Sequence, residues 1–332
     1  MENSSQSLKD IKSHTIRVRV PGTSANCGPG FDCIGLACTI YNDLQLTLLR
    51  EPKLIIETTG DGASNIPTDD RNIVWRSIRM LLERAGAADE FKGAVIRMEN
   101  HIPLSRGLGS SAAAIVAGIK AANAILGNPL NRNELLKLAT DIEGHPDNVA
   151  PALFGGITVS IVNKGQVQTF SFVPKMKLKL VVAVPDFPLS TRMARQVLPT
   201  EIPIKDAIFN IGRASMLIGA LIKGKERFLK NAFDDVLHQP YRAELIPGML
   251  DVFKAAKDAG ALGVAMSGAG PCLIAFTLER SHIENEVAAS MAQAFLDHDV
   301  KTKSLILSLD IRGAVVINGE QQEAASYEKK DF

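Results

Sequence analysis

The segment at residues 102–125, IPLSRGLGSSAAAIVAGIKAANAI, decides the fold of this chain. It passes from a proline-bearing turn through Gly107-Leu108-Gly109-Ser110-Ser111 into a long alanine-rich run, which predicts a helix over residues 110–126. A helix start leaves backbone N–H groups without partners and carries partial positive charge. Glycines let a ligand approach the backbone closely, and serine hydroxyls can bind phosphate oxygens or Mg²⁺. The pattern therefore favours a helix start that binds phosphate.

The same stretch is also typical of an ordinary helix cap. Ser110 or Ser111 would then be the N-cap residue, and the two glycines would form an ordinary turn. The stretch lacks the G-x-x-x-x-G-K-[ST] spacing and its lysine, and it is not a G-x-G-x-x-G that follows a strand. Taken alone, the segment leaves both interpretations open.

Two further glycine-rich stretches favour the ligand-binding interpretation. The first, PGTSANCGPGFDCIG at residues 21–35, follows an alternating segment at residues 15–20 that predicts a strand ended by Pro21. The second, MSGAGPCLIAF at residues 266–276, predicts a tight turn between two apolar strands. One glycine-rich loop is weak evidence, whereas three in this order are strong evidence for a ligand site.

These stretches resemble the motifs of the GHMP kinases, the superfamily of galactokinase, homoserine kinase, mevalonate kinase and phosphomevalonate kinase. The first is similar to P-A-T-S-A-N-x-G-P-G-F-D, with Gly22 in place of alanine, the second to P-x-x-x-G-L-G-S-S-A-A, and the third to S-G-A-G-P. A fourth stretch, EGHPDNVAPALFGG at residues 143–156, resembles a segment typical of homoserine kinases. The resemblance covers roughly residues 14–310.

The expected fold class is α+β with two domains. A length of 332 residues predicts about two domains, and strands and helices, among them a predicted helix at residues 226–237, alternate too irregularly for a doubly wound parallel sheet. Pro174 and the lysine-rich stretch after it mark a junction. The resemblance to the GHMP kinase fold implies an N-terminal ATP-binding domain like ribosomal protein S5 domain 2 at residues 14–172. It implies a C-terminal ferredoxin-like domain at residues 173–320.

The composition argues against several other functions. With 37 basic and 36 acidic residues the formal charge is +1, which gives no electrostatic footprint for nucleic acid. No apolar run reaches the roughly 18 residues of a membrane span. The polar N-terminus lacks the apolar h-region of a secretory signal, so no such signal is expected and the cytosol is the expected compartment. The four cysteines form no C-x-x-C and are expected to be reduced thiols without zinc. The polar ends, residues 1–10 and 321–332, are expected to fray.

The resemblance implies that the second glycine-rich stretch binds ATP together with Mg²⁺. Ser111 and Glu143 would hold the Mg²⁺, which agrees with the preference of a hard cation for oxygen ligands. The residues expected to bind the nucleotide are Asn72, Pro103, Leu104, Ser105, Arg106, Gly107, Leu108, Gly109, Ser110, Ser111, Ala112 and Ala113.

The substrate that the resemblance implies is L-homoserine, an amino acid with a side-chain hydroxyl. Arg195 and Arg242 would hold its carboxylate, because guanidinium groups bind carboxylates through paired hydrogen bonds. Arg192 is the nearest competitor to Arg195. The other residues expected to bind the substrate are Asp32, which would face the ammonium group, His145 and Thr191.

Catalysis is expected to rely on positioning and electrostatics without a strong base. By resemblance, Asn26 would orient the attacking hydroxyl. Asn148 would lie at the functional position where related enzymes use an aspartate, and Asp147 is the alternative candidate for a general base. A loose phosphoryl-transfer transition state requires little early deprotonation, which suits this expectation. The implied reaction converts ATP and L-homoserine to ADP and O-phospho-L-homoserine, a step toward threonine.

Two other functions stay open at the level of sequence. The chain could be a GHMP kinase for a different hydroxylated substrate, although the two arginines favour an amino acid over a sugar or a prenyl precursor. It could instead be a small-molecule sensor or RNA-binding module on the same folds, which the intact Ser111 and Glu143 disfavour. Because family members are often dimers, a homodimer is an open expectation.

Overall fold

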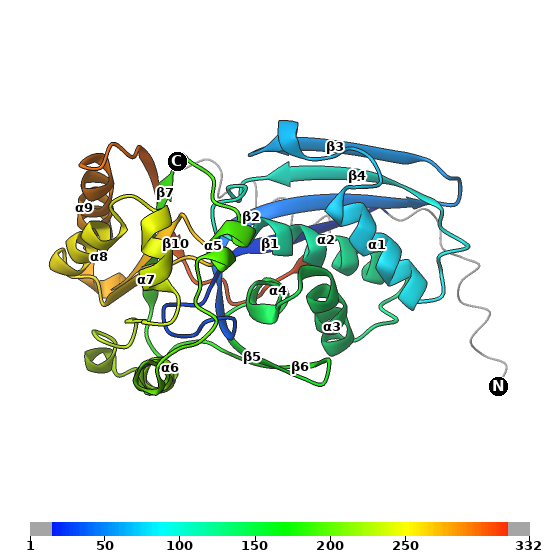
Figure 1. The fold of residues 1–332 in the computed structure, drawn as a ribbon. Helices are drawn as coiled ribbons and strands as arrows, with labels where there is room; N and C mark the ends of the chain where they lie inside the picture. Colours follow the sequence, from blue (N-terminus) through cyan, green and yellow to red (C-terminus); the bar gives the residue numbers. More distant parts are fainter. Residues whose placement is uncertain (1–14, 318–332) are drawn as a thin grey trace.

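The computed structural model describes residues 15–317 of the 332-residue chain. The expected fraying at residues 1–10 and 321–332 concerns positions outside this range, as do the outer limits of the two predicted domains. Two β-sheets, each with its own helices, make up the molecule (Figure 1). Within the described range no helix is long and apolar enough to cross a membrane.

The larger sheet contains seven strands of the described chain. Its main path runs β11-β1-β2-β4-β3, with β5 paired to β2 and β6 paired to β5. The β3–β4 pair is parallel and the other pairs are antiparallel. The strands are β1 (Ile16–Ala25), β2 (Ile34–Leu49), β3 (Leu54–Gly60), β4 (Gly93–Asn100), β5 (Ile157–Asn163), β6 (Gln166–Phe172) and β11 (Val315–Ile317).

Four helices cover one side of the larger sheet (Figure 1). Helix α2 lies against β1 and β2 because it is almost wholly buried and rich in alanine, which permits close approach to the strands. Helix α4 packs on β1, β2 and β5. The four helices are α1 (Ile73–Arg84), α2 (Ser110–Ile125), α3 (Arg132–Glu143) and α4 (Pro146–Phe154), and a short 3-10 helix at Ala63–Asn65 precedes α1.

The smaller sheet has the strand order β10-β7-β9-β8, and all of its pairs are antiparallel. Its strands are β7 (Leu178–Pro185), β8 (Gly263–Met266), β9 (Leu273–Leu278) and β10 (Thr302–Ser308). Helix α8 (Met249–Asp258) precedes β8, and helix α9 (Glu284–Leu296) precedes β10. This β-α-β-β-α-β sequence is the ferredoxin-like motif, so the α+β fold class is confirmed for this half.

The long excursion between β7 and α8 carries the remaining helices. They are α5 (Thr191–Gln196), α6 (Ile204–Lys223) and α7 (Gln239–Arg242), with 3-10 turns at Glu226–Phe228 and Ala243–Leu245. A further 3-10 turn, Glu279–Ser281, follows β9. The predicted helix at residues 226–237 is wrong, because only one 3-10 turn forms there. Residues beyond that turn run instead toward α7.

The two sheets share a hydrophobic core. Successive side chains of a strand point to opposite faces, so β7 contributes Leu180 and Val182 to the main core and Val181 and Ala183 to a second cluster under α8 and α9. The main core also contains Leu217 from α6. Elements of both halves therefore pack in one continuous core.

The chain crosses between the two sheets twice within the described range. The proposed boundary at residues 172 and 173 falls between β6, which ends at Phe172 in the larger sheet, and β7, which begins at Leu178 in the smaller one. Strand β11 then returns to pair with β1. The proposed second domain, residues 173–320, thus contains a strand that belongs to the larger sheet.

Strand β1 continues through Pro21, against the expectation that this proline ends it. The strand runs to Ala25, and its register against β2 shifts between Pro21 and Gly22. A bulge of this kind accommodates a residue that has no backbone N–H to donate. The extension carries the chain up to Asn26, where the first glycine-rich loop begins.

Candidate active site

The three glycine-rich stretches meet at one place. The backbone N–H of Thr23 donates to the carbonyl of Leu108 at 3.0 Å, and the N–H of Gly268 donates to the carbonyl of Ala25 at 3.1 Å. Nδ2 of Asn26 donates to the carbonyl of Gly268 at 2.8 Å, which joins positions 242 residues apart. Motifs that are separate in sequence thus form one hydrogen-bonded junction.

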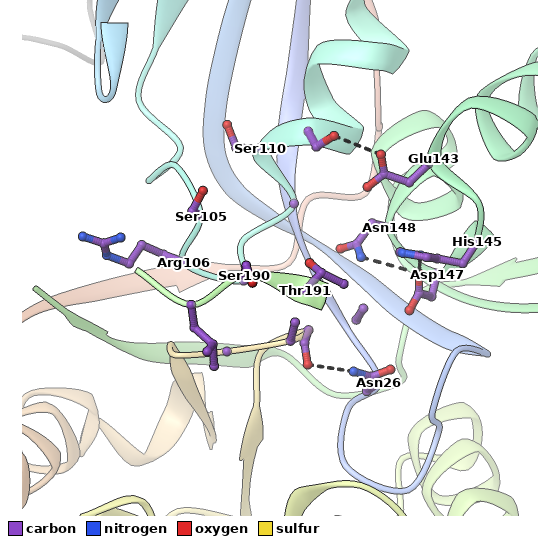
Figure 2. Close-up of a pocket in the computed structure, with 18 of the residues that line it drawn as sticks. Asn26, Ser105, Arg106, Ser110, Glu143, His145, Asp147, Asn148, Ser190 and Thr191 are labelled. Carbon is purple, nitrogen blue, oxygen red and sulfur yellow. Dashed lines mark hydrogen bonds and ion pairs between the residues drawn. The ribbon is translucent and has the colours of Figure 1, made fainter. Parts of the chain in front are cut away.

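A cavity of about 300 Å³ opens at this junction. Figure 2 shows Ser105 and Ser110 on one side of it, with His145, Asp147 and Asn148 on the other. The structure brings most of the predicted site residues together. Those that line the cavity are Asn26, Asp32, Pro103, Leu104, Ser105, Arg106, Gly107, Gly109, Ser110, Ser111, Glu143, His145, Asn148, Thr191, Arg195 and Arg242.

Helix α2 begins at the cavity without a side-chain cap. Its N-cap is Gly109, with φ 68°, and among residues 15–317 no side chain caps its first turn. The ordinary-cap interpretation, with Ser110 or Ser111 as the N-cap, is therefore wrong. Backbone N–H groups at an uncapped helix start, next to serine hydroxyls, form the arrangement that binds anions.

The two glycines of this loop are required by packing as well as by backbone conformation. A Cβ on Gly107 would lie 2.1 Å from the carbonyl oxygen of Ser267, and a Cβ on Gly109 would lie 1.9 Å from Oγ1 of Thr23. Both residues have positive φ, which favours glycine. Each glycine-rich stretch therefore fits against the others.

Three of the predicted nucleotide residues support the loop from within. Leu108, Ala112 and Ala113 are fully buried and lie outside the cavity lining. Arg106 reaches the other half of the molecule, where its Nε donates to the carbonyl of Pro185 at 2.9 Å. The second glycine-rich stretch is thereby tied to the end of β7.

Asn72 lies at the start of α1 and is not part of the cavity lining. Its Oδ1 accepts from the backbone N–H of Val74 at 2.9 Å, and its Nδ2 donates to the carbonyl of Pro67 at 2.7 Å. The side chain is 1% exposed. These contacts assign Asn72 a capping role, and nucleotide binding stays a prediction for this residue.

Ser111 and Glu143 face each other across the cavity wall. Oγ of Ser111 donates to Oε2 of Glu143 at 2.9 Å, a contact drawn as a dashed line in Figure 2. Burial raises the pKa of Glu143, and the hydrogen bond from Ser111 opposes that rise. A desolvated carboxylate next to a hydroxyl is a hard-oxygen donor set, so these two residues fit a Mg²⁺ ion that takes its other ligands from phosphate and water.

Arg195 and Asp32 form a paired ion bridge. Nη1 and Nη2 of Arg195 donate to the two carboxylate oxygens of Asp32 at 3.0 and 2.9 Å. The hydrogen bonds to Asp32 raise the pKa of Arg195. Both side chains are more than one third exposed, so the pair is accessible to a ligand. Arg192, the competitor on the same helix, does not line the cavity.

Arg242 is a buried cation that pairs with no carboxylate in the described part of the chain. It is 2% exposed, and its Nε donates to the carbonyl of Ala194 at 2.9 Å. Among residues 15–317 no carboxylate lies within ion-pair distance of it. Burial, and then the charge of Arg195, lowers the pKa of Arg242 to about 10. The site thus contains a desolvated positive charge that the carboxylates of the described residues leave unpaired.

The start of α4 supplies the opposite wall. His145 is its N-cap residue, and Nδ1 of His145 hydrogen-bonds to Oδ1 of the buried Asp147. That bond raises the pKa of His145 against the effect of burial. Oδ1 of Asn148 accepts from the hydroxyl of Thr23 at 2.8 Å. His145 and Asn148 are therefore held in place by contacts within the protein.

Asn26 connects two other site segments. Besides the contact to Gly268, its Oδ1 accepts from the backbone N–H of Asp32 at 3.0 Å. An amide has two donors on nitrogen and two lone pairs on oxygen, so one of each stays available for a ligand. The residue has φ 72°, a left-handed conformation that asparagine tolerates.

Sequence reasoning missed Phe31 and His238. The Cζ atoms of Arg195 and Arg242 lie 5.7 and 5.2 Å from the centroid of the Phe31 ring. On the same ring stacks His238, at 5.0 Å between centroids. A signal did exist, since Phe31 precedes Asp32 and His238 lies one helical turn before Arg242.

Comparison with known proteins agrees with this architecture. A family model described as GHMP kinases N terminal domain matches residues 72–156, and one described as GHMP kinases C terminal matches residues 217–296. The fold and the site therefore define a GHMP kinase.

Individual relatives narrow the class. The chain is 46% identical to the homoserine kinase of Carboxydothermus hydrogenoformans, over 90% of this chain and 95% of that protein. It is 41% identical to the homoserine kinase of Desulfitobacterium hafniense, over 91% and 100% of the two chains. A crystal structure of homoserine kinase from Cytophaga hutchinsonii superposes with a TM-score of 0.84 at 31% identity, covering 94% of this chain and 99% of that one. The chain belongs to the homoserine kinase family.

Proposed function

We propose that this enzyme transfers the γ-phosphoryl group of ATP to the side-chain hydroxyl of L-homoserine, giving ADP and O-phospho-L-homoserine. The observation that carries the proposal is Arg242, a buried guanidinium that lines the cavity and has no carboxylate partner in residues 15–317. Burying an unpaired charge is costly unless a ligand neutralises it. An α-carboxylate in the cavity would supply the missing negative charge.

The neighbouring ion pair suits an amino acid that carries both charges. Asp32 and Arg195 present a carboxylate and a guanidinium side by side at the surface of the cavity. A zwitterionic substrate would place its ammonium group at Asp32 and its carboxylate between Arg195 and Arg242. Because a zwitterion carries one charge of each sign, its binding would leave the net charge of the pocket unchanged. Thr191 lies on the same side, at the start of α5.

The nucleotide would occupy the opposite end. Ser105, Ser110 and the first N–H groups of α2 face the cavity there and would hold the phosphates. Mg²⁺ bound by Ser111 and Glu143 would neutralise charge on those phosphates. The distance between the two ends is then set by the junction of the three glycine-rich stretches.

The transfer needs a hydroxyl oxygen positioned in line with the γ-phosphorus. The new bond joins that oxygen to phosphorus as the bond from phosphorus to the ADP oxygen breaks, and the hydroxyl proton is released. Asn26 and Asn148 line the cavity, and their side-chain amides can hydrogen-bond the hydroxyl. Asp147 is 2% exposed and hydrogen-bonded to His145, which favours a positioning role for it over that of a general base.

Another GHMP kinase activity is the remaining alternative. A direct test measures ADP release with L-homoserine, mevalonate, galactose, L-serine and L-threonine, each as sole acceptor. We expect kcat/KM to be highest for L-homoserine. A higher value for mevalonate or galactose would reject the amino-acid assignment while leaving the kinase fold unaffected. The cytosolic location and the homodimer stay predictions of the sequence.

A further inference from the structure

A buried polar cluster lies beneath Arg242. Its members are Asn210 of α6, Asp235, His238 and Gln239, all less than 9% exposed. Nδ2 of Asn210 donates to Oδ1 of Asp235 at 2.7 Å, and the other carboxylate oxygen of Asp235 accepts from the backbone N–H of His238 at 3.0 Å. The cluster therefore fixes the start of α7, where His238 is the N-cap residue.

His238 contacts both halves of the site. One ring nitrogen, Nε2, lies 2.8 Å from the carbonyl oxygen of Gly28, in the first glycine-rich loop. The other, Nδ1, lies 3.2 Å from Nη1 of Arg242. The ring is fully buried.

These two contacts select one form of the imidazole. A carbonyl oxygen can only accept, so Nε2 carries the proton, and a guanidinium can only donate, so Nδ1 must be bare. A second proton would place an N–H against the N–H of Arg242. Burial also lowers the pKa of His238, and the charge of Arg242 acts in the same direction against the attraction of Asp235. His238 is thus a neutral hydrogen-bond acceptor for the arginine.

The remaining contacts of Arg242 show what this acceptor achieves. Nε is held by the carbonyl of Ala194, and Nη1 lies between His238 and the carbonyl of Gly268 at 3.4 Å. Among the described residues Nη2 has no hydrogen-bond partner. The guanidinium is therefore held through Nε and Nη1, while its Nη2 donors are left for a ligand.

We propose that His238, as the neutral Nε2–H tautomer, is the positioning residue that orients Arg242 toward the substrate carboxylate and locks it to the loop at Gly28. This inference rests on the proposed role of Arg242 as a carboxylate ligand. His238 acts through the arginine and does not itself contact the substrate.

Two substitutions separate the contacts of His238. In His238→Asn, the side-chain oxygen falls near the position of Nδ1 and can still accept from Arg242, while the contact to Gly28 is lost. In His238→Gln, the amide nitrogen falls near Nε2 and can still donate to Gly28, while the acceptor for Arg242 is lost. His298→Asn is the matched control, because that histidine is partly exposed and pairs with Asp251 away from the cavity.

We expect His238→Gln to raise the KM for L-homoserine by about 10- to 100-fold, which is the cost of leaving a charged donor without its buried partner. His238→Asn should lie closer to the parent enzyme, and kcat and the KM for ATP should change little in either variant. With 3-aminopropan-1-ol, which lacks the carboxylate, neither variant should be worse than the parent. Circular dichroism and thermal unfolding establish that each variant is folded.

The decisive comparison repeats both substitutions in an Arg242→Ala background. If His238 acts through the arginine, it has nothing to orient there, and its substitution should cost no further kcat/KM for L-homoserine. Losses that simply multiply, or equal losses for the Gln and Asn variants, would overturn the positioning role. Those outcomes leave the proposed function intact, whereas a parent enzyme that ignores L-homoserine would reject that function and say nothing against the geometry at His238.

Discussion

The proposed phosphate end and the proposed amino-acid end of the cavity are built in different ways. The phosphate end comes mainly from one continuous loop, residues 103–113, and presents backbone groups and small hydroxyls. The amino-acid end is made of side chains, Asp32, His145, Arg195 and Arg242, that come from separate segments of both halves. Substitutions at the phosphate end should therefore disturb the fold together with nucleotide binding, whereas those at the amino-acid end should mainly change substrate specificity.

The largest effect is expected from the buried arginine. Arg242→Ala removes the proposed partner of the substrate carboxylate, which should cost about 2–4 kcal/mol, or about 30- to 700-fold in kcat/KM for L-homoserine. The KM for ATP should change little, because the phosphates lie at the other end. Lysine at this position should not restore activity, since it lacks the planar fork. Arg195→Ala should lose less, because that residue is partly exposed and its removal leaves Asp32 accessible to water.

Arg192→Ala is the matched control for both arginines, because it lies on α5 outside the cavity lining. Steady-state kinetics with L-homoserine and with 3-aminopropan-1-ol distinguish the explanations. Equal losses on the two acceptors would show that neither arginine binds the carboxylate.

The next largest effect is expected at the proposed metal position, Glu143. Glu143→Gln retains the shape of the side chain and an acceptor for Ser111 but removes the charge, so the Mg²⁺ concentration for half-maximal activity should rise by about 10- to 100-fold. Homoserine binding without nucleotide should be unchanged. Because burial raises the pKa of Glu143, protonation competes with the metal, and the Mg²⁺ requirement of the parent enzyme should increase as the pH falls through that raised value. The Gln variant should lose this pH dependence.

Asp141→Asn is the control for the metal position, since Asp141 lies on the same helix but is exposed and paired with Lys137. A Glu143→Gln variant with the Mg²⁺ titration of the parent would remove this carboxylate from the metal site.

The same contrast explains what could be predicted from the sequence. The phosphate loop is local, so its glycines, serines and following helix are all legible in residues 102–125. The N-cap residue cannot be predicted from this segment, because serine is the commoner cap and the choice of Gly109 depends on Thr23 packing against it. The local sequence pattern predicts helix α2, whereas a tertiary contact with Thr23 determines where the helix begins.

The amino-acid end is not local and could be predicted only through family resemblance. Arg195 and Arg242 come from different helices, and neither is distinguishable from a surface arginine by its neighbours in sequence. The wrong prediction of a helix at residues 226–237 also results from non-local contacts. The carboxylate of Asp235 accepts hydrogen bonds from three backbone N–H groups of the next turn, including that of Gln239 at 2.7 Å. This segment therefore supports Arg242 and does not form a helix.

A smaller effect should separate packing from backbone strain at the phosphate end. Gly109→Ala should destabilise the fold by about 1–2 kcal/mol from its positive φ alone, and by more from the contact with Thr23. Gly127→Ala is the matched control, because it has φ 79° but nothing within 4 Å of the added carbon. Chemical denaturation measures both, and nucleotide affinity should fall only for the variant at residue 109.

Thr23→Ala combined with Gly109→Ala should recover part of the lost stability, since it removes the atom 1.9 Å from the new carbon. Strictly additive losses would mean that the two glycine-rich stretches do not press on each other at this point.

The smallest effect concerns Asn72, for which the resemblance implies nucleotide binding and the structure shows a helix cap. Loss of an N-cap acceptor costs about 1 kcal/mol, so Asn72→Ala should lower the free energy of unfolding by about that amount, while Asn72→Ser should retain most of it. Asn131→Ala is the control, because Asn131 caps α3 through a capping box and does not line the cavity. If Asn72 acts only in the fold, Asn72→Ala should lose at least as much stability as Asn131→Ala, because it also loses the hydrogen bond to the carbonyl of Pro67, and both variants should leave the KM for ATP unchanged. If Asn72 also binds the nucleotide, the KM for ATP should rise in Asn72→Ala and in the well-capped Asn72→Ser alike, because serine is too short to replace the amide, and the phosphate end would then extend beyond its continuous loop to the start of α1.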